Sequence, residues 1–233
     1  MKLNPGKQPP LPKAFHWLLN HAVGTTVRHH GEPATGPTLY VSNHLSWADI
    51  PILGRYLRAR FVAKSDIADT DVLKFFCAQQ RTMYVDRGDP RGSREQKDRL
   101  TEALAAGDSC IVFPEATTND GRRPMPFKTP LFQGLMSGEA PGVKVQPISI
   151  AFTRVQSMPT TRARLPFLCW LGDYGIGESV MDWLRMRSIR ADVIFHDPVD
   201  PSDFPDRKAL AAYCYNTIHR GYRRAMRDYA GPQ

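Results

Sequence analysis

Residues 38–57 read TLYVSNHLSWADIPILGRYL, a stretch that changes from strand-like to helix-like around a polar turn. Residues 38–42 are mostly the β-branched and aromatic types that favour a buried strand. From Asp49 onward, apolar residues recur at the spacing of one helix face. The turn between them carries His44. Strand, turn and helix in this order form the repeating unit of an α/β fold.

The same alternation continues outward along the chain. Short apolar runs predict further strands at residues 60–63, 82–85, 109–113, 145–152 and 191–196. Amphipathic stretches predict helices at residues 71–80, 93–107 and about 207–229. The chain has no internal repeat and no clear linker. It therefore predicts an α/β fold with a single domain, in which a mostly parallel central sheet is flanked by helices. In such sheets, sites form in the loops at the carboxyl ends of strands.

The N-terminal residues 1–30 are expected to form a segment apart from the domain of residues 31–233. Residues 14–27 are largely apolar, but they include His16 and Asn20 and fall short of the roughly 18 apolar residues that a spanning helix needs. The apolar face of residues 15–27 predicts an amphipathic helix in a membrane interface.

A second candidate for membrane contact combines residues 165–170 with Trp183 and Leu184, beside Arg185 and Arg187. Basic flanks of this kind attract anionic lipid. The alternative is that this stretch and the N-terminal one are ordinary core segments.

The composition restricts the possible partners. A net charge of +8 favours anionic ones. The four cysteines are widely spaced and form no CxxC pair, so neither a metal site nor a disulfide framework is expected. Basic and aromatic residues are not interleaved as they are in a nucleic-acid-binding groove, so nucleic acid is not an expected partner.

His44 and Asp49 are the first candidates for chemistry. His44 lies in the turn after a strand, and a helix beginning near Asp49 can bring that carboxylate back to the imidazole. A carboxylate on one ring nitrogen fixes the tautomer and raises the basicity of the other nitrogen. Such a pair can remove a proton from an alcohol. Taken alone, the spacing is also that of a solvated loop histidine followed by a helix-start aspartate.

Two later loops also follow predicted strands. Arg87 precedes a glycine and can present its guanidinium to phosphate or carboxylate, with a surface ion pair as the alternative. Glu115 could orient a substrate hydroxyl, and Thr117 and Thr118 could hold an anionic group. The alternative for this third loop is a polar connection that ends in a tight turn.

A fourth motif, VQPI at residues 145–148, completes a series whose order and spacing are specific. The series resembles the glycerolipid acyltransferase family, which includes the 1-acylglycerol-3-phosphate acyltransferases. That family has Asn-His-x4-Asp, Asp-Arg, Phe-Pro-Glu-Gly-Thr and Val-Pro-Ile-like boxes in this order. Here they correspond to residues 43–49, 86–87, 113–117 and 145–148.

The resemblance implies a role for each matching residue. His44 would be the general base and Asp49 its partner, Arg87 would bind the acceptor's polar head, and Glu115 and Thr117 would position the acceptor. It also implies direct attack of a lysolipid hydroxyl on an acyl carrier protein or coenzyme A thioester, with no metal and no bound cofactor. The expected location is the cytoplasmic face of the inner membrane, as a peripheral or monotopic protein of membrane lipid biosynthesis.

Two positions depart from the family pattern and bear on the acceptor. Ala116 stands in place of glycine, and Thr118 stands where phosphate-handling members usually carry arginine. The stretch around 126–132, with Pro-Phe-Lys and Leu-Phe, is similar to the lyso-ornithine lipid acyltransferase branch. An ornithine-type acceptor is therefore expected. The alternatives are a lysophosphatidic acid acyltransferase that makes phosphatidic acid, and a catalytically inactive membrane-associated member of the family.

Overall fold

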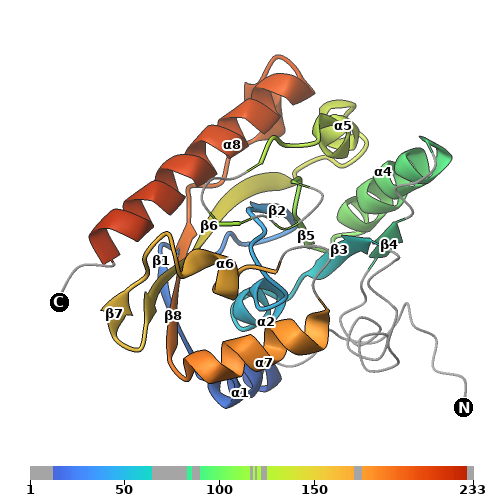
Figure 1. Cartoon of the computed structure of the whole chain (residues 1–233). Coiled ribbons are helices and arrows are strands. Elements are labelled where there is room, and N and C mark those ends of the chain that lie inside the picture. Colours follow the sequence, from blue (N-terminus) through green and yellow to red (C-terminus); the bar gives the residue numbers. More distant parts are fainter. Residues whose placement is uncertain are drawn as a thin grey trace, which may run out of the picture.

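The computed structural model describes residues 13–64, 83–85, 90–115, 118, 120–121, 125–170 and 175–229. Their strands form one sheet, with helices packed on both of its faces (Figure 1). The order across the sheet is β1-β8-β6-β2-β5-β3-β4, and the short β7 pairs with β6. The strands are β1 (Thr25–His30), β2 (Thr38–Ser42), β3 (Arg60–Lys64), β4 (Met83–Val85), β5 (Cys110–Val112), β6 (Lys144–Val155), β7 (Met158–Pro159) and β8 (Ile189–Phe195).

Most of the sheet is parallel, as the sequence predicts. Strands β6, β2, β5, β3 and β4 run in one direction. Strand β8 is antiparallel to β6, and β1 pairs with β8 in parallel. Because β2 and β5 are parallel neighbours, the loops that follow them leave the same edge of the sheet. The turn with His44 and the loop with Glu115 therefore meet.

Helices cover the two faces of the sheet over separate hydrophobic cores. Successive residues of β2 point to opposite faces, so Tyr40 packs in one core while Leu39 and Val41 pack in the other. The first core includes α2 and α7 residues, and the second includes α4 and α8 residues. The helices are α1 (Lys13–Ala22), α2 (Asp49–Gly54), α4 (Pro90–Ala105), α5 (Gln133–Met136), α6 (Leu165–Leu168), α7 (Ile176–Met186) and α8 (Arg207–Arg224), which continues into a π-helical turn (Ala225–Tyr229).

The N-terminal region differs in detail from the expectation. Helix α1 ends at Ala22, and residues 25–30 form β1, which pairs with β8 at the edge of the sheet. Gly24 makes the change of direction possible: its φ is +71°, and a Cβ there would lie 2.2 Å from the carbonyl oxygen of Arg187. The helix expected at 71–80 lies outside the described residues.

No helix in the described ranges has the length and apolar content that crossing a bilayer would require. The expectation of an interfacial helix therefore depends on the surface that α1 presents.

Candidate active site

His44 and Asp49 lie in direct contact at the carboxyl end of β2. The Nδ1 atom of His44 is 2.8 Å from Oδ2 of Asp49. The aspartate side chain is fully buried, whereas that of His44 is 14% exposed. A carboxylate accepts hydrogen bonds, so Nδ1 donates and the lone pair of Nε2 remains available to a substrate proton.

The backbone of the turn explains how a five-residue offset brings the pair together. The backbone N–H groups of Leu45 and Ser46 donate to the same Asp49 Oδ2, at 2.7 and 2.9 Å. Asp49 is also the first residue of α2, so its side chain closes the turn that precedes its own helix. One carboxylate oxygen thus sets both the path of the loop and the direction of the imidazole.

Asn43 anchors this turn to the neighbouring strand. Its side-chain amide donates to the carbonyl of Ile150 at 2.9 Å and accepts the backbone N–H of Ile150 at 2.8 Å. The side chain is fully buried. No role for Asn43 alone was predicted from the sequence, although an asparagine directly between a strand end and a candidate histidine was the available signal.

Glu115 and Phe113 hold His44 from the side of β5. One Glu115 carboxylate oxygen accepts the backbone N–H of His44 at 3.3 Å, and the other accepts that of Met125 at 3.0 Å. The Phe113 ring stacks on the imidazole, with centroids 4.1 Å apart. Glu115 is only 3% exposed. These contacts make it a bridge between two loops, while its expected role toward the acceptor hydroxyl stays a prediction.

The third loop is tied to the C-terminal half of the chain. The hydroxyl of Thr118 donates to the carbonyl of Trp170, and the Tyr222 hydroxyl donates to the carbonyl of Gly121. The backbone N–H of Trp170 in turn donates to the Leu45 carbonyl at 2.9 Å. These bonds connect the loop after β5 with the segment before α7 and with α8.

Three positions singled out in the sequence, Arg87, Ala116 and Thr117, lie outside the described residues. The roles expected of Arg87 and Thr117 stay predictions. Thr118 is described, and its hydroxyl is directed at the Trp170 carbonyl, so binding of an anionic group by this side chain also stays a prediction.

A thiol near the site is held neutral by its surroundings. Burial raises the pKa of Cys169 well above its usual range, and the nearby charges of Asp49, Asp120 and Glu115 raise it further. A buried thiol of this kind is a poor nucleophile, because the thiolate is the reactive form. Within the described ranges, no three His, Cys, Asp or Glu side chains gather as potential metal ligands.

Comparisons with known proteins agree with this geometry. Residues 25–151 match the family model described as acyltransferase. The chain is 36% identical to the lyso-ornithine lipid O-acyltransferase of Brucella abortus, over 94% of this chain and 84% of that protein. It is 34% identical to the protein of the same name from Rhizobium meliloti, over 86% and 70% of the two chains.

Two more distant relatives are also named as acyltransferases. The 1-acyl-sn-glycerol-3-phosphate acyltransferase of Neisseria gonorrhoeae is 27% identical, over 74% of this chain and 64% of that protein. The crystal structure of the 1-acyl-sn-glycerophosphate acyltransferase of Thermotoga maritima shares the fold, with a TM-score of 0.67 at 21% identity and coverage of 95% and 79%. The chain is therefore an enzyme that transfers acyl groups, and it belongs to the acyltransferase family.

Proposed function

We propose that the chain transfers a fatty acyl group from an acyl carrier protein or coenzyme A thioester to the free hydroxyl of lyso-ornithine lipid. The observation that carries this proposal is the His44–Asp49 pair, in which Nδ1 is bound to a buried carboxylate at 2.8 Å and Nε2 is left for the substrate. The pair lies at the carboxyl end of a parallel strand, where α/β folds place their sites.

The reaction requires one base and no covalent enzyme intermediate. Nε2 of His44 takes the proton of the acceptor hydroxyl while the hydroxyl oxygen attacks the thioester carbonyl carbon. The tetrahedral intermediate then collapses, the carbon–sulfur bond breaks, and the imidazolium returns the proton to the leaving thiolate. Asp49 stabilises the imidazolium formed between these steps. An ester and a free thiol are the products.

The acceptor is inferred from the relatives and from one substitution. Lyso-ornithine lipid O-acyltransferases cover most of this chain at 34–36% identity. Thr118 carries no charge for a phosphate, and its hydroxyl is bonded to the Trp170 carbonyl. Lysophosphatidic acid is the second candidate, since relatives named for that reaction also match the chain.

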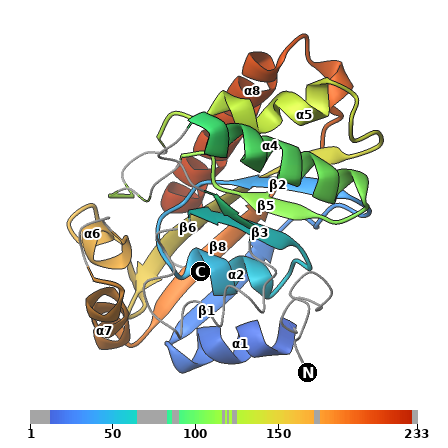
Figure 2. The ribbon, with the colours of Figure 1, turned by 90° about the vertical axis from the view of Figure 1, so that its right-hand side faces the viewer.

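Membrane contact is proposed for the end of the molecule that carries α1 and α7. Helix α1 is turned so that polar His16 and Asn20 are buried against α2, while Trp17 and Leu18 are 48% and 57% exposed. An exposed apolar pair on a helix whose polar residues face the protein is the arrangement that an apolar phase stabilises. Both views place α1 and α7 at the same end of the molecule (Figures 1 and 2).

Helices α6 and α7 add to this surface. Phe167 of α6 and both Met181 and Leu184 of α7 are 40–56% exposed. Arg185 and Arg187, at the end of α7, are exposed as well and would attract anionic lipid. The proposed location is the cytoplasmic face of the inner membrane, where acyl thioesters are available and the protein would bind peripherally.

The test is an acyl-transfer assay with purified protein, acyl carrier protein or coenzyme A thioesters, and the two lysolipids as separate acceptors. Faster transfer to lyso-ornithine lipid supports the proposal, and faster transfer to lysophosphatidic acid favours the second candidate. Loss of transfer in His44→Ala, with liposome binding unchanged, would identify His44 as the base. Absence of transfer from every donor to either acceptor would contradict both proposed acceptors.

A further inference from the structure

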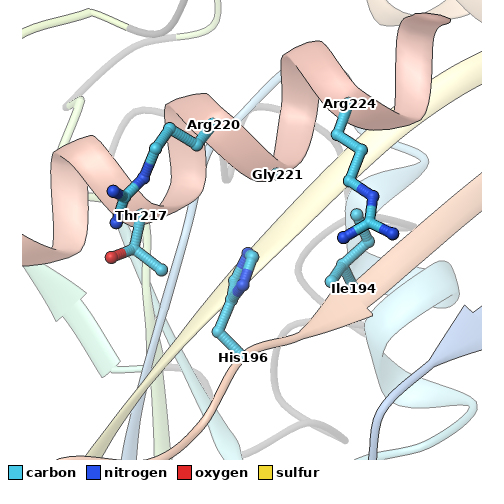
Figure 3. Close-up of a pocket in the computed structure, with 6 residues that line it drawn as sticks. All are labelled: Ile194, His196, Thr217, Arg220, Gly221 and Arg224. Atoms are coloured by element: carbon cyan, nitrogen blue, oxygen red, sulfur yellow. The ribbon is translucent and has the colours of Figure 1, made fainter. Parts of the chain in front are cut away.

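A cavity of about 220 Å³ lies between α8 and the end of β8. Figure 3 shows that the guanidinium groups of Arg220 and Arg224 extend from α8 to opposite sides of His196. The charged side chains in the lining of this cavity therefore do not converge on one point. A closer convergence of polar groups lies between α1 and α2, and α2 begins at Asp49.

The most buried face of α1 is polar. Its two buried residues, His16 and Asn20, are one helical turn apart and only 2% and 1% exposed. A helix on a hydrophobic core usually turns an apolar stripe inward. Here polar groups make the contact with α2, and hydrogen bonds are directional whereas the hydrophobic effect is not. This interface can therefore fix one position of α1 relative to α2.

Asn20 forms the hydrogen bond between the two helices. Its Nδ2 atom donates to the carbonyl of His16, in its own helix, at 2.7 Å and to the carbonyl of Pro51, in α2, at 2.8 Å. Both hydrogens of the amide are thereby used. One bond sets the orientation of the side chain on α1, and the other ties α1 to a residue two positions after Asp49.

Asn20 is not the residue that stability alone would favour at this position. Its Oδ1 atom is buried with no hydrogen-bond partner among the residues that the structure describes. A buried acceptor without a partner destabilises the folded state, and asparagine favours a helix less than alanine does. The Pro51 carbonyl also accepts the backbone N–H of Arg55 at 3.2 Å, so α2 would keep this bond without Asn20. Buried polar groups that cost stability can serve to fix how two helices pack.

Helix α2 is short, and its first residue is Asp49. It contains six residues, Asp49–Gly54. In so short a helix, a shift of the Pro51 carbonyl moves the whole backbone, including the residue that holds the His44 imidazole. A displacement of about 1 Å caused by a distant substitution can reduce a rate by about a hundredfold. The bond from Asn20 is therefore placed to affect the base through Asp49.

We propose that Asn20 is a positioning residue for acyl transfer: its bond to the Pro51 carbonyl fixes α2 against α1 and so keeps Asp49 in place on His44. This inference rests on the function proposed for the His44–Asp49 pair. Asn20 acts through α2 rather than on the reacting atoms. The helix proposed to contact the membrane is thereby bonded to the helix that carries the partner of the base.

The first test compares the acyl-transfer kinetics of Asn20→Ala with those of Asn216→Ala, a matched control at an exposed position of α8. In Asn20→Ala, kcat should fall by about tenfold or more, while KM for the acceptor stays within about twofold of wild type. Alanine removes the unpartnered oxygen and favours the helix, so the urea midpoint should stay close to that of wild type. A kcat equal to that of the control, or lowered only in proportion to the unfolded fraction, would overturn the inference.

The second test does not depend on activity. The ¹H–¹⁵N signal of the His44 Nδ1–H group, identified by its loss in His44→Gln, reports the bond to Asp49. This signal should move in Asn20→Ala and keep its wild-type position in Asn216→Ala. An unmoved signal in Asn20→Ala overturns the inference whatever kcat does. If the signal moves but wild type transfers no acyl group, Asn20 still positions the pair, and the proposed function is what fails.

Discussion

The carboxylate of Glu115, on the loop after β5, accepts the backbone N–H of His44, on the loop after β2, at 3.3 Å. Its other oxygen accepts the backbone N–H of Met125 at 3.0 Å. The Glu115 side chain is buried, so its two bonds stand where the protein leaves little room for water. Glu115 thus joins two loops that must keep a fixed relation for the imidazole to stay in place.

Glu115→Ala should therefore lower both stability and activity. Each backbone N–H left without a partner costs about 1–3 kcal/mol of unfolding free energy. Urea unfolding followed by tryptophan fluorescence measures this loss. Glu102→Ala, at an exposed position of α4, should stay within about 0.5 kcal/mol of wild type. An equal effect of the two substitutions would show that the Glu115 bridge contributes little.

Asp49→Asn should reduce acyl transfer by about a hundredfold or more, since general base catalysis contributes about 10²–10⁴-fold. The asparagine can keep the two backbone bonds through its oxygen, but it lacks the charge that stabilises the imidazolium. The rate constant under saturating acceptor measures the effect. Asp203→Asn is the control, because Asp203 is exposed and lies in the short helix Pro201–Asp203. This variant should transfer acyl groups at the wild-type rate.

The stability of the protein should fall between pH 7 and pH 5 because His16 is buried. Burial lowers the pKa of His16 from 6.5 to about 4. Between these values the unfolded chain binds the proton and the folded chain does not, so unfolding becomes more favourable as the pH falls. The contribution of one such histidine at pH 5 is about 2 kcal/mol.

Urea unfolding at pH 7 and at pH 5 measures how much unfolding free energy the protein loses between them. His16→Gln should make this loss smaller than in wild type, whatever the substitution does to stability at pH 7. His21→Gln, at an exposed position of the same helix, should leave the pH dependence as in wild type. If wild type and His16→Gln lose equal amounts of unfolding free energy from pH 7 to pH 5, His16 is not a source of the pH dependence.

Two glycines should respond in opposite directions to alanine. A Cβ at Gly54 would lie 2.6 Å from the His16 ring, whereas a Cβ at Gly177 meets open space. Gly177→Ala should stabilise α7 by roughly 0.5–1 kcal/mol through helix propensity. Gly54→Ala should destabilise the protein by about 1–3 kcal/mol, because α1 must move away from α2. Thermal unfolding of both variants distinguishes these outcomes.

Trp17→Gln/Leu18→Gln should weaken binding to phosphatidylglycerol vesicles by about tenfold or more, since burying each apolar side chain contributes about 1.5–3 kcal/mol. Met158→Gln is the control, because Met158 is 61% exposed but belongs to β7 rather than to α1. Sedimentation with vesicles measures the binding. If the double variant binds as tightly as the control, α1 is not the membrane contact.

Much of the fold follows from local patterns. The run at 38–42 is β2 to the residue, and the helix expected from Asp49 begins there. Strand β1 was not predicted because its sequence, TTVRHH, is polar and follows an apolar stretch that reads as one helix to residue 27. Residues 25–30 form a strand because they pair with β8, and that pairing joins segments far apart in the chain.

The sequence by itself determined strands β2 to β6 and β8, helices α2, α4 and α8, the candidate pair of His44 and Asp49, and the family, because these depend on residue types at short spacings. The tertiary structure decided the rest of the site. Asn43 binds Ile150 across 107 positions, and Glu115 binds His44 across 71. The tertiary structure also decided that α1 buries its polar residues His16 and Asn20. Contacts of this kind depend on which segments pack together, and no local periodicity encodes that choice.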